Sequence, residues 1–252
     1  MLSGVKRALL AVSAATMIFG ASSAMADDSD KTYIIACDAA YAPFSWEQDG
    51  KYVGIDVEVL DAIAKASGFK YELKPMNFEG VIPGLISGQL DGAIAGINMN
   101  DERRQILDFS DGYFDSGLSV IVKEDSKINT IEDLKGTRAA VKKGTTGALF
   151  VESIADKDNV TAQYYTSSPE TMMAVKNGYA DFLCEDYPVI AYQIKIGVQK
   201  GLRIAIPRVS GTPQYGFGVK KGTHAELIKM FNDGLKTIKE NGTYDKIVGQ
   251  YL

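Results

Sequence analysis

The sequence predicts an α/β protein built from two similar lobes. Short apolar runs typical of strands alternate along the chain with amphipathic segments typical of helices. The second observation is an internal repeat, present in "LISGQLDGAIAGIN" and again in "AVKNGYADFLCEDYP". In each copy a helix ends at a glycine, an aspartate follows three residues later, and an apolar strand begins. A Gly-x-x-Asp spacing also occurs at unrelated helix ends, but the shared order of helix, turn and strand favours two related lobes.

The first copy of the pattern occupies the first hundred residues or so. "DVEVLDAIAKASGF" has apolar residues at helical spacing and a helix stop at Gly68, whereas "YIIAC" reads as a buried strand. We expect strands at 33–37, 70–75 and 92–97, and helices at 56–68 and 81–90.

A similar series follows in the second half of the chain. We expect strands at 118–124, 138–144, 161–166 and 181–186, and helices at 147–155 and 170–178. The tail at 225–252 reads as two successive helices broken near Gly242.

The N-terminal segment has the features of a secretory signal peptide. Lys6 and Arg7 precede an uncharged apolar run at 8–20, and small residues at Ala24 and Ala26 form a cleavage site. We therefore expect residues 1–26 to be removed and the protein to be exported in soluble form to the periplasm. The apolar run is too short to anchor the chain in a bilayer.

Composition excludes several classes of function. With 32 acidic and 27 basic residues the net charge is −5, and no lysine-arginine run occurs, so neither nucleic acid nor an anionic membrane surface is an expected partner. A single histidine, His224, leaves no material for a histidine-ligated metal site or triad. No metal and no cofactor is predicted. Cys37 and Cys184 could pair in an oxidising compartment, but both lie in apolar strand-like runs and are expected to be free, buried residues.

Chemistry-bearing residues follow the two repeated strands. Parallel α/β sheets bind ligands beyond the carboxyl ends of their strands. After the first strand, Asn100 or Asp101 should cap a short helix with Arg103 in its first turn, which is an anion site suited to a carboxylate. Arg104 is expected on the surface. After the second strand, Asp186 can accept from an ammonium group. Together these charges match the two ends of an α-amino acid.

At this point the chain resembles a known family. The segments "DAAYAPFSW", "KYVGIDVEVLDAIAK", "YELKPMNFEGVIPGL", "AGINMNDERRQILDFSDGYF", "AAVKKGTTG", "EDYP" and "ENGTYDKI" resemble the amino-acid-binding periplasmic proteins of ABC importers, most of all the glutamine-binding type. The resemblance implies a two-lobe periplasmic binding protein fold of type II that closes on its ligand. Lobe 1 would comprise 31–112 and 215–252, and lobe 2 would comprise 118–209, with hinge segments at 113–117 and 210–214. It also implies a monomer that meets a membrane ABC permease transiently.

The resemblance also implies a role for each site residue. Arg103, helped by Asn98 and Thr146, would hold the α-carboxylate. Asp186 would hold the α-ammonium together with a backbone carbonyl near Ala95 and Gly96. The implied contacts of the ligand side chain are Tyr41 and Phe78 on its two faces and Asp38 and Lys142 at its tip.

Two departures from the glutamine-binding type bear on the ligand. Asn98 stands where threonine is usual, and Glu185 stands where histidine is usual. Strand alternation predicts that Glu185 points away from Asp186. A carboxamide can donate to Asp38 and accept from Lys142, so glutamine is the predicted ligand. An inward Glu185 would instead favour arginine or lysine.

An enzyme is the rival from another class, because dehydratases and peptidoglycan lyases have been built on this fold. Glu185 could then serve as a general acid beside Asp186. The other expected cleft residues all have binding roles, so we predict no catalytic residue.

Overall fold

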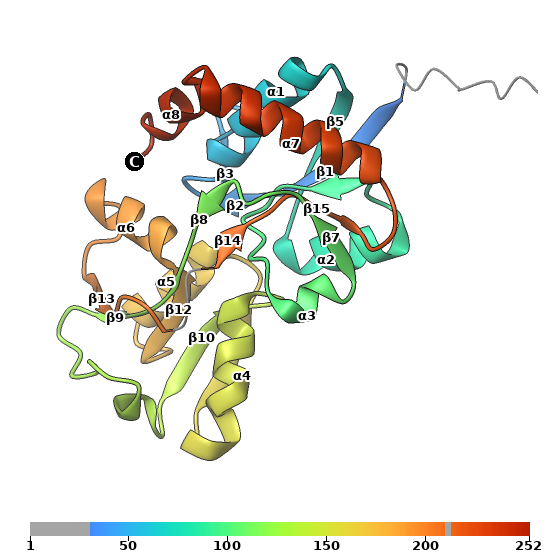
Figure 1. Ribbon diagram of the computed structural model, residues 1–252. Coiled ribbons are helices and arrows are strands. Elements are labelled where there is room, and N and C mark those ends of the chain that lie inside the picture. The colour runs from blue at the N-terminus through green and yellow to red at the C-terminus, as the bar shows by residue number, and fades with distance from the viewer. Residues whose placement is uncertain (1–30, 210–212) are drawn as a thin grey trace, which may run out of the picture. The chain divides into compact units, whose positions relative to one another are not determined.

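The computed structural model describes residues 31–209 and 213–252 (Figure 1). The predicted signal peptide lies outside the described residues, as does part of the second predicted hinge segment. The helices are α1 (Ile55–Ser67), α2 (Phe78–Ser87), α3 (Asp101–Arg104), α4 (Thr146–Asp158), α5 (Ser168–Lys176), α6 (Tyr187–Lys195), α7 (Ala225–Glu240) and α8 (Thr243–Val248). The strands are β1 (Thr32–Asp38), β2 (Ala40–Tyr41), β3 (Ser45–Gln48), β4 (Lys51–Val53), β5 (Lys70–Met76), β6 (Gly92–Ala93), β7 (Leu107–Phe109), β8 (Phe114–Asp115), β9 (Leu118–Lys123), β10 (Arg138–Lys142), β11 (Thr161–Tyr165), β12 (Phe182–Asp186), β13 (Leu202–Ile206), β14 (Gln214–Tyr215) and β15 (Gly218–Lys220).

Two sheets in the described part of the chain share one topology. Their strand orders are β5-β1-β6-β15-β7 and β11-β10-β12-β9-β13. In each sheet the first three strands run parallel and the last two join antiparallel. The predicted α/β class with two related units is therefore confirmed.

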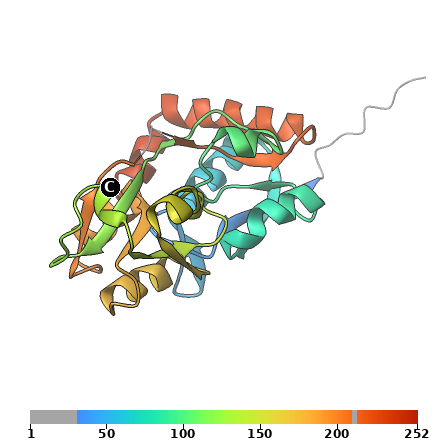
Figure 2. The ribbon, with the colours of Figure 1, turned by 90° about the horizontal axis from the view of Figure 1, so that it is seen from below.

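Alternation along the central strands determines which helices cover each face. In β1, Tyr33 and Ile35 face the apolar stripe of α1 and α7, while Ala36 packs with α2 on the other face. Figure 1 shows α7 lying alongside α1. In β10, Ala139 packs with α4 and Ala140 with α5 and α6. Figure 2, seen from below, shows α7 (red) on one side of the first sheet and α2 (teal) on the other.

The Gly-x-x-Asp repeat fastens equivalent strands in the two sheets. Both glycines are left-handed, with φ of 77°, and so end the preceding helix turn. Asp91 Oδ2 accepts from the backbone N–H of Ile34 at 2.8 Å, and Asp181 Oδ2 accepts from that of Arg138 at 2.8 Å. Ile34 and Arg138 lie in β1 and β10, which occupy the same place in their sheets.

The two repeated strands end differently, which corrects one prediction. β12 reaches Asp186 as expected, but β6 stops at Ala93 rather than continuing to 97. Gly96 has a left-handed φ of 57°, and its N–H donates to the Asp56 carboxylate at 2.9 Å instead of to a neighbouring strand. The backbone just beyond β6 is therefore hydrogen-bonded to a buried side chain of α1.

Other local predictions are confirmed. Helix α1 ends with Gly68 as its left-handed C-cap, and Gly242 separates α7 from α8. Cys37 and Cys184 are buried and free. No helix among the described residues has the length and apolarity needed to cross a bilayer.

Two short strands lie on the connections between the sheets. β8 and β14 pair antiparallel through Phe114–Tyr215 and Asp115–Gln214. They fall in or beside the predicted hinge segments 113–117 and 210–214, and the bounds of the lobes and hinges stay a prediction.

The repeat yields a stability prediction. Asp91→Ala leaves the Ile34 N–H without its acceptor, so the free energy of unfolding should fall by about 1–3 kcal/mol. Urea unfolding followed by circular dichroism measures the change. Because Asp91 lies away from the strand-end cavity described below, ligand affinity should not change. An unaltered unfolding midpoint would contradict the assigned role of the repeat.

Candidate functional site

One cavity brings together every site residue expected from the sequence. Its lining contains Asp38, Tyr41, Phe78, Ala95, Gly96, Asn98, Arg103, Lys142, Thr146, Glu185 and Asp186. Sequence reasoning did not select four further lining residues, Leu118, Thr145, Gly147 and Cys184. The cavity lies between segments that follow strands of both sheets, so each sheet contributes side chains to it. That these residues bind a ligand stays a prediction.

Arg103 is held as a buried, oriented cation. As predicted, Asn100 caps the short helix α3, with its Oδ1 accepting from the Arg103 N–H at 2.8 Å. The guanidinium donates from Nη1 to the Asn98 carbonyl at 3.1 Å and from Nη2 to the Gly144 carbonyl at 3.0 Å. Burial lowers the pKa of Arg103. Both of these acceptors are uncharged, so the cation keeps donor capacity for a carboxylate. Arg104 is exposed, as expected.

Asp186 is a buried carboxylate that accepts from three side chains. Tyr41 Oη donates at 2.8 Å, Tyr215 Oη at 2.6 Å and Asn98 Nδ2 at 3.1 Å. Burial raises the pKa of Asp186, whereas these three hydrogen bonds and the positive charge of Arg103 oppose the rise. Tyr41 and Asn98 follow strands of the first sheet, and Asp186 ends a strand of the second. The carboxylate therefore links segments from both sheets.

Asn98 and Tyr215 both differ from the sequence prediction. Asn98 was expected to help Arg103 hold a carboxylate of the ligand, but its amide donates to Asp186. The Asn98 amide also donates to Thr146 Oγ1 at 3.2 Å, so all the hydrogen bonds of its Nδ2 lead to segments of the second sheet. Sequence reasoning missed Tyr215 altogether. Its position immediately after the predicted hinge segment 210–214 was the available signal, since a hinge residue lies next to the cleft.

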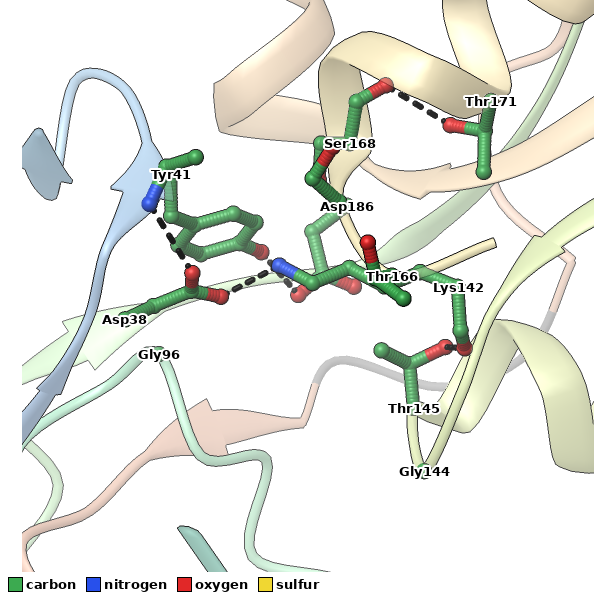
Figure 3. Close-up of polar contacts among 12 residues, drawn as sticks. Asp38, Tyr41, Gly96, Lys142, Gly144, Thr145, Thr166, Ser168, Thr171 and Asp186 are labelled. Carbon is green, nitrogen blue, oxygen red and sulfur yellow. Dashed lines mark hydrogen bonds and ion pairs between the residues drawn. The ribbon is translucent and has the colours of Figure 1, made fainter. Parts of the chain in front are cut away.

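Asp38 and Lys142 form a buried ion pair across the cavity. The Lys142 ammonium donates to Asp38 Oδ2, and the two side chains are 4% and 3% exposed. The ammonium lies 4.8 Å from the ring centre of Tyr41 and 5.7 Å from that of Phe78. Figure 3 shows Lys142 extending toward Asp38, with Tyr41 and Asp186 beside them. A paired cation and anion therefore lie next to both rings.

Glu185 lines the cavity even though strand alternation holds along β12, where Phe182 and Cys184 pack on the α4 side and Leu183 packs on the α5 and α6 side. Glu185 is only 7% exposed and lines the same cavity as Asp186. Asp186 is both the last residue of β12 and the N-cap of α6, and its N–H donates to Glu185 Oε1 at 3.0 Å. Burial, reinforced by the charge of Asp186 and opposed by that of Lys142, raises the pKa of Glu185 to about 7.

Two sheets of one topology, with a charged cavity at their strand ends, define a type II solute-binding protein. Residues 33–252 match the family described as bacterial extracellular solute-binding proteins, family 3. The chain belongs to this family.

Relatives and solved structures agree with this assignment. The chain is 34% identical over 231 residues to a probable histidine-binding protein of Neisseria gonorrhoeae, covering 91% of this chain and 86% of that protein. It is 31% identical over 207 residues to the ABC transporter glutamine-binding protein GlnH of Bacillus subtilis, covering 81% and 74%. A structure of an ancestral arginine-binding protein bound to arginine has a TM-score of 0.81 at 36% identity, covering 88% and 98%. An ancestral arginine-binding protein bound to glutamine has a TM-score of 0.79 at 36% identity, covering 88% and 97%.

The site geometry predicts unequal roles for two adjacent arginines. Arg103→Ala should weaken amino-acid binding by about 30-fold to several-thousand-fold, because a buried carboxylate would lose its charged partner at about 2–5 kcal/mol. Arg104→Ala is the matched control and should change affinity less than about twofold. Titration calorimetry with L-glutamine and L-arginine measures both. Equal losses for the two variants would mean that the face of α3 is wrongly assigned.

Proposed function

We propose that the protein captures one free L-amino acid in the strand-end cavity, with L-glutamine as the preferred ligand, and delivers it to an ABC importer. The observation on which the choice of glutamine depends is the Asp38–Lys142 pair beside Tyr41 and Phe78. The family and the similar proteins support amino-acid binding in general.

The backbone groups of the ligand have natural partners in the cavity. The α-carboxylate fits Arg103 and the adjoining N-terminus of α4, where Thr145 caps the helix and Thr146 begins it. The α-ammonium fits Asp186, whose carboxylate is already oriented by its three hydrogen bonds. Groups fixed before binding lose little conformational freedom when the ligand arrives.

The side chain of the ligand would extend between the rings toward Asp38 and Lys142. A carboxamide that entered between the paired Asp38 and Lys142 would satisfy both, because its NH₂ donates to Asp38 and its carbonyl accepts from Lys142. Glutamate would place a second carboxylate against Asp38. A cationic side chain would meet the ammonium of Lys142, and like charges in contact cost several kcal/mol when desolvated, on the order of a thousandfold in affinity.

A basic amino acid is the second candidate, and one observation favours it. Glu185 lies in the cavity, so its ionised form adds a negative charge that would offset Lys142 and leave Asp38 for a cation. The names of the arginine- and histidine-binding relatives point the same way. Glu185 is thus the residue on which the choice between the two ligands depends.

The remaining parts of the proposal follow from export and the two-lobe fold. The protein would act in the periplasm after removal of residues 1–26, as a monomer whose lobes close about segments 113–117 and 210–214. The closed form would then meet the membrane permease transiently. No catalytic step is proposed.

Calorimetry at two pH values separates the candidates. A pKa near 7 leaves Glu185 mostly protonated at pH 6 and mostly ionised at pH 8. We expect L-glutamine to bind more tightly than L-arginine at both pH values, with affinity that varies little between them. Any arginine binding should weaken as the pH falls, and Glu185→Gln should remove that dependence. A preference for L-arginine that survives Glu185→Gln would contradict the argument from Asp38 and Lys142.

A further inference from the structure

We propose that Asp56 is a positioning residue for the α-ammonium group of the ligand, acting through the Ala95–Gly96 peptide, and that it connects this part of the cavity to the first hinge segment. The inference deepens the proposed function and depends on it. Asp56 lies outside the cavity lining, in the first turn of α1, and is fully buried.

The contacts of Asp56 lead directly to the cavity. Its Oδ2 accepts from the Gly96 N–H at 2.9 Å, and its Oδ1 accepts from Tyr113 Oη at 2.7 Å. The Gly96 N–H also approaches Tyr113 Oη at 3.3 Å. The Asp56 carboxylate thus binds Gly96, which is 40 residues away in sequence, and Tyr113, which is 57 residues away.

A carboxylate is a costly choice for this position. Both side-chain and backbone donors that reach it are uncharged, and a buried charge without an opposite charge is unfavourable. Burial raises the pKa of Asp56 to about 7, against the hydrogen bonds from Tyr113 and Gly96 that lower it. The first turn of α1 offsets part of the cost because a helix N-terminus favours negative charge. A purely structural contact would be met more cheaply by an amide.

The Ala95–Gly96 peptide shows what the carboxylate holds in place. In a planar trans peptide the N–H and C=O groups point in opposite directions. Because Asp56 binds the Gly96 N–H on the core side, the Ala95 carbonyl is directed away from Asp56, and Ala95 and Gly96 both line the cavity. An ammonium group there can donate to this carbonyl and to Asp186.

The rings of Tyr41 and Tyr215 pack against the Ala95–Gly96 peptide on the side of the cavity. Gly96 has a φ of 57°, and a Cβ on it would lie 2.6 Å from the Tyr41 ring and 3.4 Å from the Tyr215 ring. The backbone is therefore packed against the same two tyrosines that donate to Asp186. A fixed peptide therefore fixes the position of the Ala95 carbonyl relative to the Asp186 carboxylate, and these are the two acceptors for the ammonium group.

Tyr113 extends the network to the connection between the sheets. It is the first residue of the predicted hinge segment 113–117, and its N–H donates to the Tyr215 carbonyl at 2.9 Å. Movement of this segment would therefore act on Asp56 and on the carbonyl that it orients. The amine end of the ligand is coupled to the hinge through one side chain.

The test compares ligands with and without an α-amino group. L-glutamine and 4-carbamoylbutanoic acid, which lacks that group, are titrated into the wild type, Asp56→Asn and Tyr113→Phe. We expect Asp56→Asn, whose amide oxygen accepts less strongly from the Gly96 N–H than a carboxylate does, to weaken L-glutamine binding by about fivefold, and 4-carbamoylbutanoic acid binding by less than about twofold. Tyr113→Phe should give a smaller loss with the same ligand dependence.

Asp91→Asn is the matched control, since Asp91 is also a lobe 1 carboxylate that accepts from a backbone N–H. It should leave both affinities unchanged. In the ligand-free protein, the amide proton resonance of Gly96 should move upfield in Asp56→Asn and stay in place in Asp91→Asn.

Two results would overturn the proposal: equal losses of affinity for both ligands in Asp56→Asn, or a Gly96 resonance that does not move. A wild type that binds L-arginine in preference to L-glutamine would refute the glutamine assignment alone. The same comparison would then use L-arginine and 5-guanidinopentanoic acid, so the two failures are distinguishable.

Discussion

The burial of the Asp186 carboxylate is the constraint on which the rest of the site depends. A carboxylate removed from water must be hydrogen-bonded or it destabilises the fold. Here the donors are Tyr41, Tyr215 and Asn98, which follow strands of the first sheet or lie on the connection between the sheets. Satisfying one buried charge therefore draws segments from both sheets to a single point. The cavity forms around that point.

The remaining charges of the cavity are arranged around this carboxylate. Arg103 donates to carbonyls and is available to an anion, while Asp38 and Lys142 neutralise each other. An α-amino acid adds one negative and one positive group, so the arrangement stays balanced when Glu185 is protonated. When Glu185 is ionised the cavity has one excess negative charge. Under the proposed function, selectivity for a neutral or a cationic side chain would therefore depend on Glu185, whose pKa burial raises to about 7.

The sequence predicted what local patterns determine. The helix, turn and strand of the repeat could be predicted because each glycine ends a helix turn and each aspartate binds the adjacent strand. The position of Arg103 could also be predicted, because "NDERR" begins with Asn100, the residue that caps the helix. Cavity residues from distant segments, such as Asp38 and Lys142, were selected from the resemblance to a family and not from a local pattern.

What could not be predicted depends on contacts between distant residues. Nothing in the neighbourhood of Asp56 shows that it binds Gly96, since the two meet only when α1 packs beside the end of β6. Strand alternation placed Glu185 on the Leu183 side of β12 but could not show that this side also reaches the cavity at the strand end. The position of Tyr215 beside the predicted hinge segment was visible in the sequence, but its hydrogen bond to Asp186, 29 residues away, was not.

Hydrogen exchange measured by mass spectrometry tests most directly whether the cavity between the two sheets is the ligand site. The protein would be compared free and with saturating L-glutamine or L-arginine. The account predicts that the bound amino acid slows exchange at 95–104 from the first lobe and at 142–147 and 184–187 from the second. Slower exchange confined to one lobe, or located away from these segments, would contradict it.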